Sequence, residues 1–442
     1  MKLPRICALS LFRFFHCTRQ TVLHSKLSRG TLLFLLGNIV TGTAIAQQAT
    51  DGDSEQAEST EKAPPKEETV ERELEAGEDP LAQQTSELHE QPGFWYRDHT
   101  SLKPYGSVRY RYAISDDSSG FDDAGSRFGL SGELQWKEGF WLLGRAEVGF
   151  NLFEELNEVI SASGRLSDSF EDMSARLIYG GVSTPSTTLT FGKNWSSYYQ
   201  VSGLTDRFSD YGGEASGTYN ALTDGGPTGT GRADTAFQGR FSVDSMAEYW
   251  NLKPFKLNVQ YQPGEEIPQT DGFDYQQSAG FSALLETQNG SFLGIAYNHA
   301  VIDEADLPAL RSQGIDGDAQ ALILGSRRFG DDYYMAMTIT WMENHETTDA
   351  GTYFDGWGWE GFASRRIAPK WWFIGGWNAL TPHGDQTQAG EYQLLYGVIG
   401  LRYTFDEFRR MIYSELRIDD SYNEDGSKIG NIFSLGVRWD LP

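Results

Sequence analysis

Apolar and polar side chains alternate with a period of two along most of the chain after residue 104. In the stretch 127–137, for example, one face is apolar and consists of Phe128, Leu130, Leu134 and Trp136. This period is typical of a β-strand with one apolar and one polar face. We find sixteen segments of this kind and predict a strand for each: 104–115, 126–136, 140–152, 174–184, 187–194, 243–251, 255–262, 275–287, 291–302, 318–329, 332–344, 357–367, 371–381, 392–405, 409–419 and 431–441.

The predicted connections alternate in length. Short turns, such as Lys137-Glu138-Gly139, follow the even-numbered strands, and polar loops of roughly eight to nearly fifty residues follow the odd-numbered ones. An outer-membrane barrel with both chain ends in the periplasm requires this alternation. We therefore predict an all-β fold, a 16-stranded antiparallel transmembrane β-barrel with long extracellular loops and short periplasmic turns. A secreted propeller or sandwich is the alternative, but such proteins do not regularly set charged strand faces between alternating short and long connections.

The first 98 residues have a different composition. Residues 1–46 carry six Lys or Arg and no acid, followed by an apolar run and an Ala44-Ile45-Ala46 site, which is typical of a cleavable signal peptide. A membrane anchor is the alternative, but the run is shorter than the roughly 20 residues that a spanning helix needs. Residues 47–98 are acidic and poor in aromatic residues, which predicts a disordered periplasmic linker. The barrel then occupies residues 99–442.

Charge and reactive residues narrow the function further. A formal net charge of −26 argues against a nucleic-acid partner, which would need a basic face. Both cysteines, Cys7 and Cys17, lie in the predicted signal peptide, and the later histidines show neither metal-ligand spacing nor a Ser-His-acid pattern. His299 lies on an outward strand face, where an outer-membrane lipase could place a catalytic histidine, but a polar girdle residue is the simpler interpretation. We expect no enzyme activity, no metal and no other cofactor.

A barrel of sixteen strands leaves an aqueous channel, whereas about eight strands fill their interior with side chains. The longest predicted connection runs from Trp195 to about Phe241 and is rich in Gly, Ser, Thr and Asp. Loops of this length are usually functional or disordered. An inward-folded third loop would narrow the otherwise open channel.

Short motifs around this loop are informative: Phe191-Gly192-Lys193-Asn194, then Leu204-Thr205-Asp206, then Asp210-Tyr211-Gly212-Gly213-Glu214. Together with the stretches 126–133 and 257–261, they resemble strand and loop motifs of the trimeric general diffusion porins of Gram-negative outer membranes. The resemblance extends over about residues 104–442. It implies a water-filled constriction at which acids of the third loop face bases of the barrel wall.

The resemblance assigns the charged residues of this constriction. The acids belong to the loop and are Asp206 and Asp210, with Glu214 nearby. The wall bases that match the motifs are Arg127 and Lys193, and lumen-facing strand parity independently selects Arg109, Arg127 and Arg145. Opposed charges orient dipolar solutes and disfavour apolar ones, so this arrangement would select by size and polarity.

Two features depart from the family pattern. In the predicted sixth strand, 243–251, Glu248-Tyr249-Trp250 stands where the family commonly has a wall arginine. We therefore expect a smaller basic cluster. The chain also ends in Trp439-Asp440-Leu441-Pro442 rather than in the aromatic residue that is usual in the family.

The predicted function is passive diffusion of small hydrophilic solutes and ions through a homotrimeric porin in contact with outer-membrane lipid and lipopolysaccharide. From residue 99 onward there are 47 acids and 26 bases, which predicts a modest cation preference. The acidic clusters at 303–306 and 316–318 could bind divalent cations that bridge lipopolysaccharide, although such clusters are more often simply solvated. The alternatives are a substrate-specific channel for a sugar, nucleoside or organic acid, with aromatic stacking in the third loop, and a barrel that mainly receives partners at the surface.

Overall fold

The structure is a computed structural model that describes residues 95–97, 100–115, 118–151, 173–243, 252–406 and 410–441. The predicted signal peptide and most of the predicted linker lie outside the described residues. The same holds for residues 152–172, which include the stretch 153–171 that is long enough to latch over a neighbouring subunit in the predicted trimer. Of the predicted linker, residues Trp95–Arg97 form the short strand β1.

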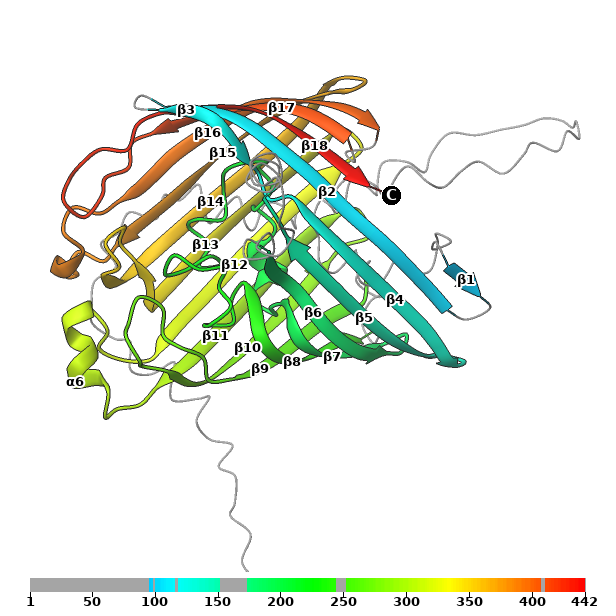
Figure 1. Cartoon of the computed structure of the whole chain (residues 1–442), viewed down its shortest axis with the longest axis horizontal. Helices are drawn as coiled ribbons and strands as arrows, with labels where there is room; N and C mark the ends of the chain where they lie inside the picture. The colour runs from blue at the N-terminus through cyan, green and yellow to red at the C-terminus, as the bar shows by residue number, and fades with distance from the viewer. Residues whose placement is uncertain are drawn as a thin grey trace, which may run out of the picture.

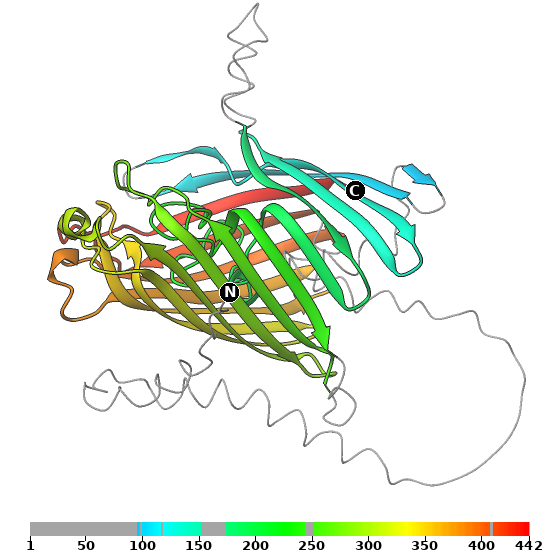
Figure 2. The same cartoon turned by 90° about the horizontal axis from the view of Figure 1, so that it is seen from below.

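Within these ranges, sixteen strands form one antiparallel cylinder (Figures 1 and 2). They are β2 (Thr100–Ile114), β4 (Arg127–Lys137), β5 (Phe140–Gly149), β6 (Ser174–Ser183), β7 (Thr187–Trp195), β8 (Arg232–Val243), β9 (Phe255–Pro263), β10 (Tyr275–Glu286), β11 (Ser291–Ile302), β12 (Ala319–Gly330), β13 (Tyr333–Thr347), β14 (Tyr353–Ala368), β15 (Trp371–Pro382), β16 (Leu394–Asp406), β17 (Arg410–Asp419) and β18 (Ile432–Leu441). The predicted 16-stranded barrel is confirmed.

The barrel closes where β18 pairs with β2 over Gly106–Ile114. Two further short strands pair with the ends of β2. Strand β1 pairs with the first residues of β2, and β3 (Ser119–Asp123) pairs with its last residues, beyond the point where β4 begins. Closure leaves no exposed strand edge in a hydrocarbon environment, where unpaired backbone groups cost several kcal/mol each.

The alternation of side chains explains why these segments form barrel strands. On β18, Phe433, Leu435, Val437 and Trp439 are 41–49% exposed on the outer face, whereas the intervening Ser434 is completely buried. A regular stripe of exposed large apolar side chains on the outer face is what a lipid-facing wall requires. Among the described residues, no helix is both long and apolar enough to cross a bilayer.

The predicted sixth strand is wrong. The strand β8 spans Arg232–Val243, not 243–251, and residues 244–251 lie outside the described residues. It pairs with β7 on one side and β9 on the other, with Phe237 outward and Gln238 inward. The small residues Ala233, Ala236 and Gly239 weaken its hydrophobic pattern, which is why the sequence assigned it to the loop.

The connection from β7 to β8, residues 196–231, is called loop 3 below. It begins with a single helical turn, α4 (Tyr199–Ser202), and lies in front of β11–β13 in Figure 1. Its Tyr198, Val201 and Leu204 belong to one buried cluster with inward side chains of β10–β16, including Ile323, Phe362 and Ile374. On this side loop 3 therefore covers the inner wall, where the apolar side chains of this cluster lie among buried polar ones such as Gln260 and Glu360.

The remaining connections follow the predicted alternation with two exceptions. Strands β13 and β14 are longer than predicted, so only residues 348–352 join them. Strand β8 ends at Val243 and β9 begins at Phe255, farther apart than the short turn predicted there, and residues 244–251 lie outside the described residues. In both views, α6 (Leu307–Leu310) and other long connections lie at one end of the barrel, and β1 and the β4–β5 turn lie at the opposite end (Figures 1 and 2).

Candidate functional site

Buried side-chain amides hold the returning limb of loop 3, residues 224–231, against the inner wall. Gln260 Nε2 donates to the Gly229 carbonyl at 2.9 Å, and Gln262 Nε2 donates to the Gly226 carbonyl at 2.8 Å. Asn298 Nδ2 donates to the Thr228 carbonyl at 2.7 Å. These inward residues of β9 and β11 satisfy carbonyls that would otherwise be buried without partners.

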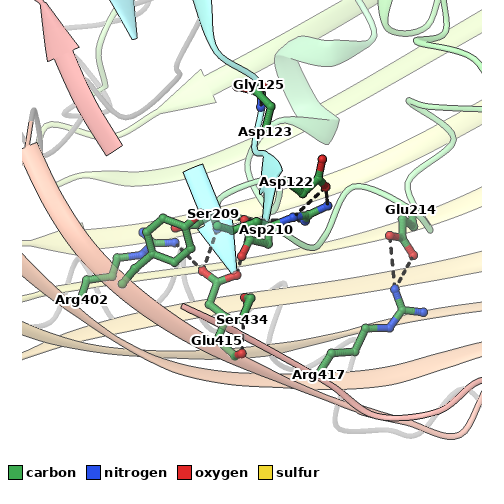
Figure 3. A network of polar contacts seen from close by, with 12 residues as sticks. Asp122, Asp123, Gly125, Ser209, Asp210, Glu214, Arg402, Glu415, Arg417 and Ser434 are labelled. Carbon is green, nitrogen blue, oxygen red and sulfur yellow. Dashed lines mark hydrogen bonds and ion pairs between the residues drawn. The ribbon is translucent and has the colours of Figure 1, made fainter. Parts of the chain in front are cut away.

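Two buried carboxylates hold the outgoing limb of loop 3, the part that runs from Thr205 to Ala215. Glu360 of β14 accepts the Thr205 hydroxyl at 2.5 Å and the Ala215 N–H at 2.8 Å. Glu415 of β17 accepts the N–H groups of Ser209 and Asp210 at 2.7 and 3.1 Å (Figure 3). Hydrogen bonds to charged groups are among the stronger ones in proteins. Loop 3 is therefore fixed at several points along its length.

The three predicted loop acids lie in different environments. Asp206 accepts hydrogen bonds from the hydroxyls of Tyr199 and Tyr219, at 3.0 and 2.7 Å. The Asp210 side chain is 0% exposed, and its Oδ1 accepts the Tyr413 hydroxyl at 2.7 Å. It therefore points at the wall rather than into open water.

Glu214 pairs with Arg417 at 3.3 Å and is 39% exposed (Figure 3). Its desolvation raises the pKa of the carboxyl above the ordinary value, and the charge of Arg417 opposes that shift. Glu214 therefore has a guanidinium partner on β17, the strand whose Glu415 also binds the loop 3 backbone at Ser209 and Asp210.

Two of the four predicted wall bases, Arg127 and Arg145, gather around one acid, Glu147 of β5. Arg145 contacts the Glu147 carboxylate at 3.2 Å, and Arg127 acts on it electrostatically. Arg176 donates to the same carboxylate at 2.9 Å, and Tyr105 donates to it at 2.9 Å. This group, the Glu147 cluster, carries three guanidinium groups and one carboxylate on β4–β6.

The other two predicted bases lie apart from this cluster. Arg109 of β2 donates to the Ser107 hydroxyl at 2.8 Å. Lys193 contacts Asp234 at 2.5 Å and Asp224 at 3.2 Å. Lys193 is thus held by acids that the sequence did not select rather than by Asp206 or Asp210.

Two arginines that were not selected from the sequence, Arg176 and Arg232, also lie at this site. Strict alternation puts Arg176 on the outer face with Ile178, but a register shift between Glu147 and Val148 turns its side chain inward. Arg232 is the first residue of β8, stacks 4.8 Å from the Trp195 ring centroid, and contacts Asp224 at 3.5 Å. The inferred loss of a wall arginine at Trp250 is therefore wrong, because it rested on the misplaced strand.

The aromatic residues at the start of loop 3 are already occupied. The rings of Trp195 and Tyr199 stack on each other with centroids 3.9 Å apart, and Arg232 covers Trp195. Tyr198 and Tyr199 are at most 1% exposed. These rings do not offer free faces on which a sugar could stack.

No group of three or more His, Cys, Asp or Glu side chains in the described ranges is arranged to hold a metal ion. His299 contacts Asp318 at 2.8 Å on the outer side of β11 and β12. The ring of Tyr297 lies beside the His299 ring, as expected for a polar residue in an aromatic girdle. Neither a metal site nor His299 thus provides a site in the described ranges. The candidate site is the passage between loop 3 and the charged wall.

Comparison with known proteins agrees with this geometry. No family profile matches the chain. The chain is 24% identical over 258 residues to the outer membrane porin PhoE of Salmonella typhimurium, which covers 58% of this chain and 67% of that protein. The solved structure of Salmonella typhi OmpF in complex with daunomycin matches 78% of this chain and 99% of its own, with a TM-score of 0.62 and 16% identity.

A second solved structure, the trimer form of OmpT from Vibrio cholerae, has a TM-score of 0.53 and 14% identity. It covers 78% of this chain and 100% of its own. At these identities the structural matches establish the fold, and the sequence match adds a distant relationship.

Proposed function

This chain is a distant relative of the general porins of the Gram-negative outer membrane, and on that premise we propose that small hydrophilic solutes and ions diffuse through it between loop 3 and the Glu147 cluster. It is a porin-type channel of the outer membrane and not an enzyme. The long connections then face the outside, the short turns face the periplasm, and loop 3 folds inward as the constriction. Residues 1–46 then act as the signal peptide and 47–98 as a periplasmic linker.

One observation carries this proposal: loop 3 occupies one side of the lumen and leaves a charged wall on the other. It packs on the inner faces of β10–β17, whereas Arg127, Arg145 and Arg176 project from β4–β6. Solutes that pass between them stay hydrated and meet charge on the wall. Such a passage disfavours apolar solutes, which must give up solvation without gaining contacts.

Planar-bilayer recordings test the proposal. We expect stepwise insertion of open channels whose conductance rises in proportion to bulk salt, because a water-filled passage has no saturable site. Sugars and nucleosides at low concentration are expected not to block the current, since the rings of Trp195 and Tyr199 at the start of loop 3 already stack on each other. A block that saturates at low solute concentration would favour the substrate-specific alternative, and the absence of conductance would favour a surface anchor.

We propose a modest cation preference. The barrel region has 47 acids and 26 bases, and fixed charge acts over about 8 to 10 Å at physiological salt. Against this, the sixth barrel strand, β8, carries an arginine, Arg232, so the bases near loop 3 are more numerous than the sequence predicted. The two effects oppose each other, and the preference should fade as salt rises.

The change Asp206→Asn tests the role of the loop acids. Removing this charge is expected to shift the reversal potential in a salt gradient toward anions, because the carboxylate lies on loop 3 beside two tyrosine hydroxyls that asparagine can still accept from. Glu138→Asn, in the exposed β4–β5 turn, is the control and should leave the potential unchanged. An unchanged potential in Asp206→Asn would remove Asp206 from the constriction.

We propose a homotrimer, which is supported by the trimer form of a structural relative. Native mass measurement in mild detergent is expected to give three chains per particle. A particle of one chain under the same conditions would contradict the proposal.

A further inference from the structure

The tip of loop 3 lies at the seam where the barrel closes. Asp210, at this tip, contacts residues of β17 and β2. These two strands flank β18, which joins the two ends of the barrel. From β17, the Tyr413 hydroxyl donates to Asp210 Oδ1 at 2.7 Å. From β2, the Arg111 guanidinium lies 3.8 Å from the same oxygen. The first strand of the barrel thus contributes a cation to the tip of its third loop.

The short strand β3 holds Arg111 in this position. Asp122 is the cross-strand partner of Arg111, and its Oδ2 accepts from Nη2 at 2.6 Å and from Nε at 3.2 Å (Figure 3). The next residue, Asp123, accepts the N–H groups of Gly125 and Ser126 at 2.8 and 2.7 Å, which turns the chain from β3 into β4. Asp122 therefore directs the guanidinium toward the loop tip.

The Asp210 carboxylate needs such a neighbour. Its side chain is 0% exposed, and its Oδ2 has no hydrogen-bond partner among the described residues. A buried carboxylate is strongly disfavoured unless a cation or further donors compensate it. Glu415, which binds the tip backbone, adds a second buried negative charge nearby, balanced by Arg402 at 3.4 Å. Without Arg111, the buried carboxylate of Asp210 would face the wall without this compensating cation.

We propose that Arg111 is a positioning residue that keeps the loop 3 tip docked at the seam, and that β3 of the first loop sets this position through Asp122. The width of the constriction then depends on an element of the first long connection. The inference deepens the proposed function and rests on it for its consequence for permeation. The contact itself can be tested without measuring conduction.

A single cysteine at Ser209 reports the position of the tip. The Ser209 hydroxyl is buried and has no hydrogen-bond partner in the described structure, and its N–H bonds Glu415 through the backbone, so Ser209→Cys retains that bond. The only native cysteines, Cys7 and Cys17, are replaced with serine in the reporter. We expect slow labelling by a charged, water-soluble thiol reagent, and labelling about tenfold faster when Arg111→Gln is added, because a contact to a buried charge is lost.

Three further variants separate positioning from general loosening. Arg111→Lys retains the charge and should keep labelling slow. Asp122→Asn, at a half-exposed site, releases the guanidinium without removing a buried group and should accelerate labelling even if Arg111→Gln fails to fold. Arg145→Gln removes another lumen-facing guanidinium, which bonds Tyr105 and Glu147 of the Glu147 cluster, and should label like the parent reporter.

The proposal is overturned if Arg111→Gln and Asp122→Asn label at the parent rate. It is also overturned if Arg145→Gln accelerates labelling as much as Arg111→Gln, since that result would indicate a loosened barrel. These outcomes are distinct from failure of the proposed function. A parent protein that forms no conducting channel would refute the function whatever the labelling rates are.

Discussion

Replacing Glu360 with alanine is expected to release loop 3 from the wall and to raise the single-channel conductance. Glu360 is 1% exposed and accepts the Thr205 hydroxyl and the Ala215 N–H through its two separate oxygens. Each buried donor left without a partner costs about 1–3 kcal/mol. The variant therefore loses most of the free energy with which these two hydrogen bonds hold loop 3 against the wall. When the loop leaves the wall, the passage becomes wider and its width fluctuates. The current should become both larger and noisier.

The measurement is single-channel recording in planar bilayers, together with protease sensitivity of loop 3 in the folded barrel. Glu360→Gln retains the shape and one acceptor oxygen, so its effect should be smaller than that of Glu360→Ala. Glu138→Ala, in the exposed turn between β4 and β5, should behave as the parent. Parent-like conductance and protease resistance in Glu360→Ala would show that Glu360 does not hold the loop.

The barrel itself is predictable from the sequence because its physics is local and repeated. Each strand must present apolar side chains to lipid and cannot do so without a period of two, as Phe433, Leu435 and Val437 illustrate. The alternation of short and long connections then fixes the topology. Fifteen of the sixteen predicted strands overlap barrel strands over most of their length, and the exception is β8, whose many small residues lower the contrast between its faces.

Side-chain direction fails where the backbone departs from regular pairing. Arg176 lies next to a register shift between β5 and β6, and Lys193 lies next to one between β7 and β8. One extra residue in a strand reverses the face on which later side chains lie. Periodicity therefore gave the wrong face for Arg176, and the motif match selected Lys193 but not its partners Asp224 and Asp234.

The anchors of loop 3 leave no local signal in the sequence. Glu360 and Glu415 look like ordinary inward polar positions. Most of their loop 3 partners are backbone N–H groups, which lie at least 145 positions earlier in the chain. Any loop sequence supplies such donors. Only the assembled barrel shows that these carboxylates bind the loop rather than line water.

The Glu147 cluster offers the sharpest test of how the wall sets ion selectivity. Arg176→Gln and Glu147→Gln change the charge of one cluster by one unit in opposite directions. In Arg176→Gln, Glu147 retains Arg145 and the Tyr105 hydroxyl, so its carboxylate stays compensated. Removing all its basic partners together would leave a buried charge unpaired, at a cost of about 3–5 kcal/mol, and would confound selectivity with stability.

Arg176→Gln is expected to shift the reversal potential in a salt gradient toward cations, and Glu147→Gln is expected to shift it toward anions. One unit charge about 8 Å from a permeating ion changes its energy by about 0.5–2 kcal/mol at effective dielectric constants of about 80 to 20. The permeability of each ion should therefore change by between about twofold and thirtyfold, in opposite directions for cations and anions. Arg410→Gln, which alters a partly exposed ion pair with Asp406 at the end of β16, is the control. If both cluster variants shift the potential in the same direction, or neither differs from the control, the ions do not pass the Glu147 cluster, and the passage lies elsewhere along loop 3.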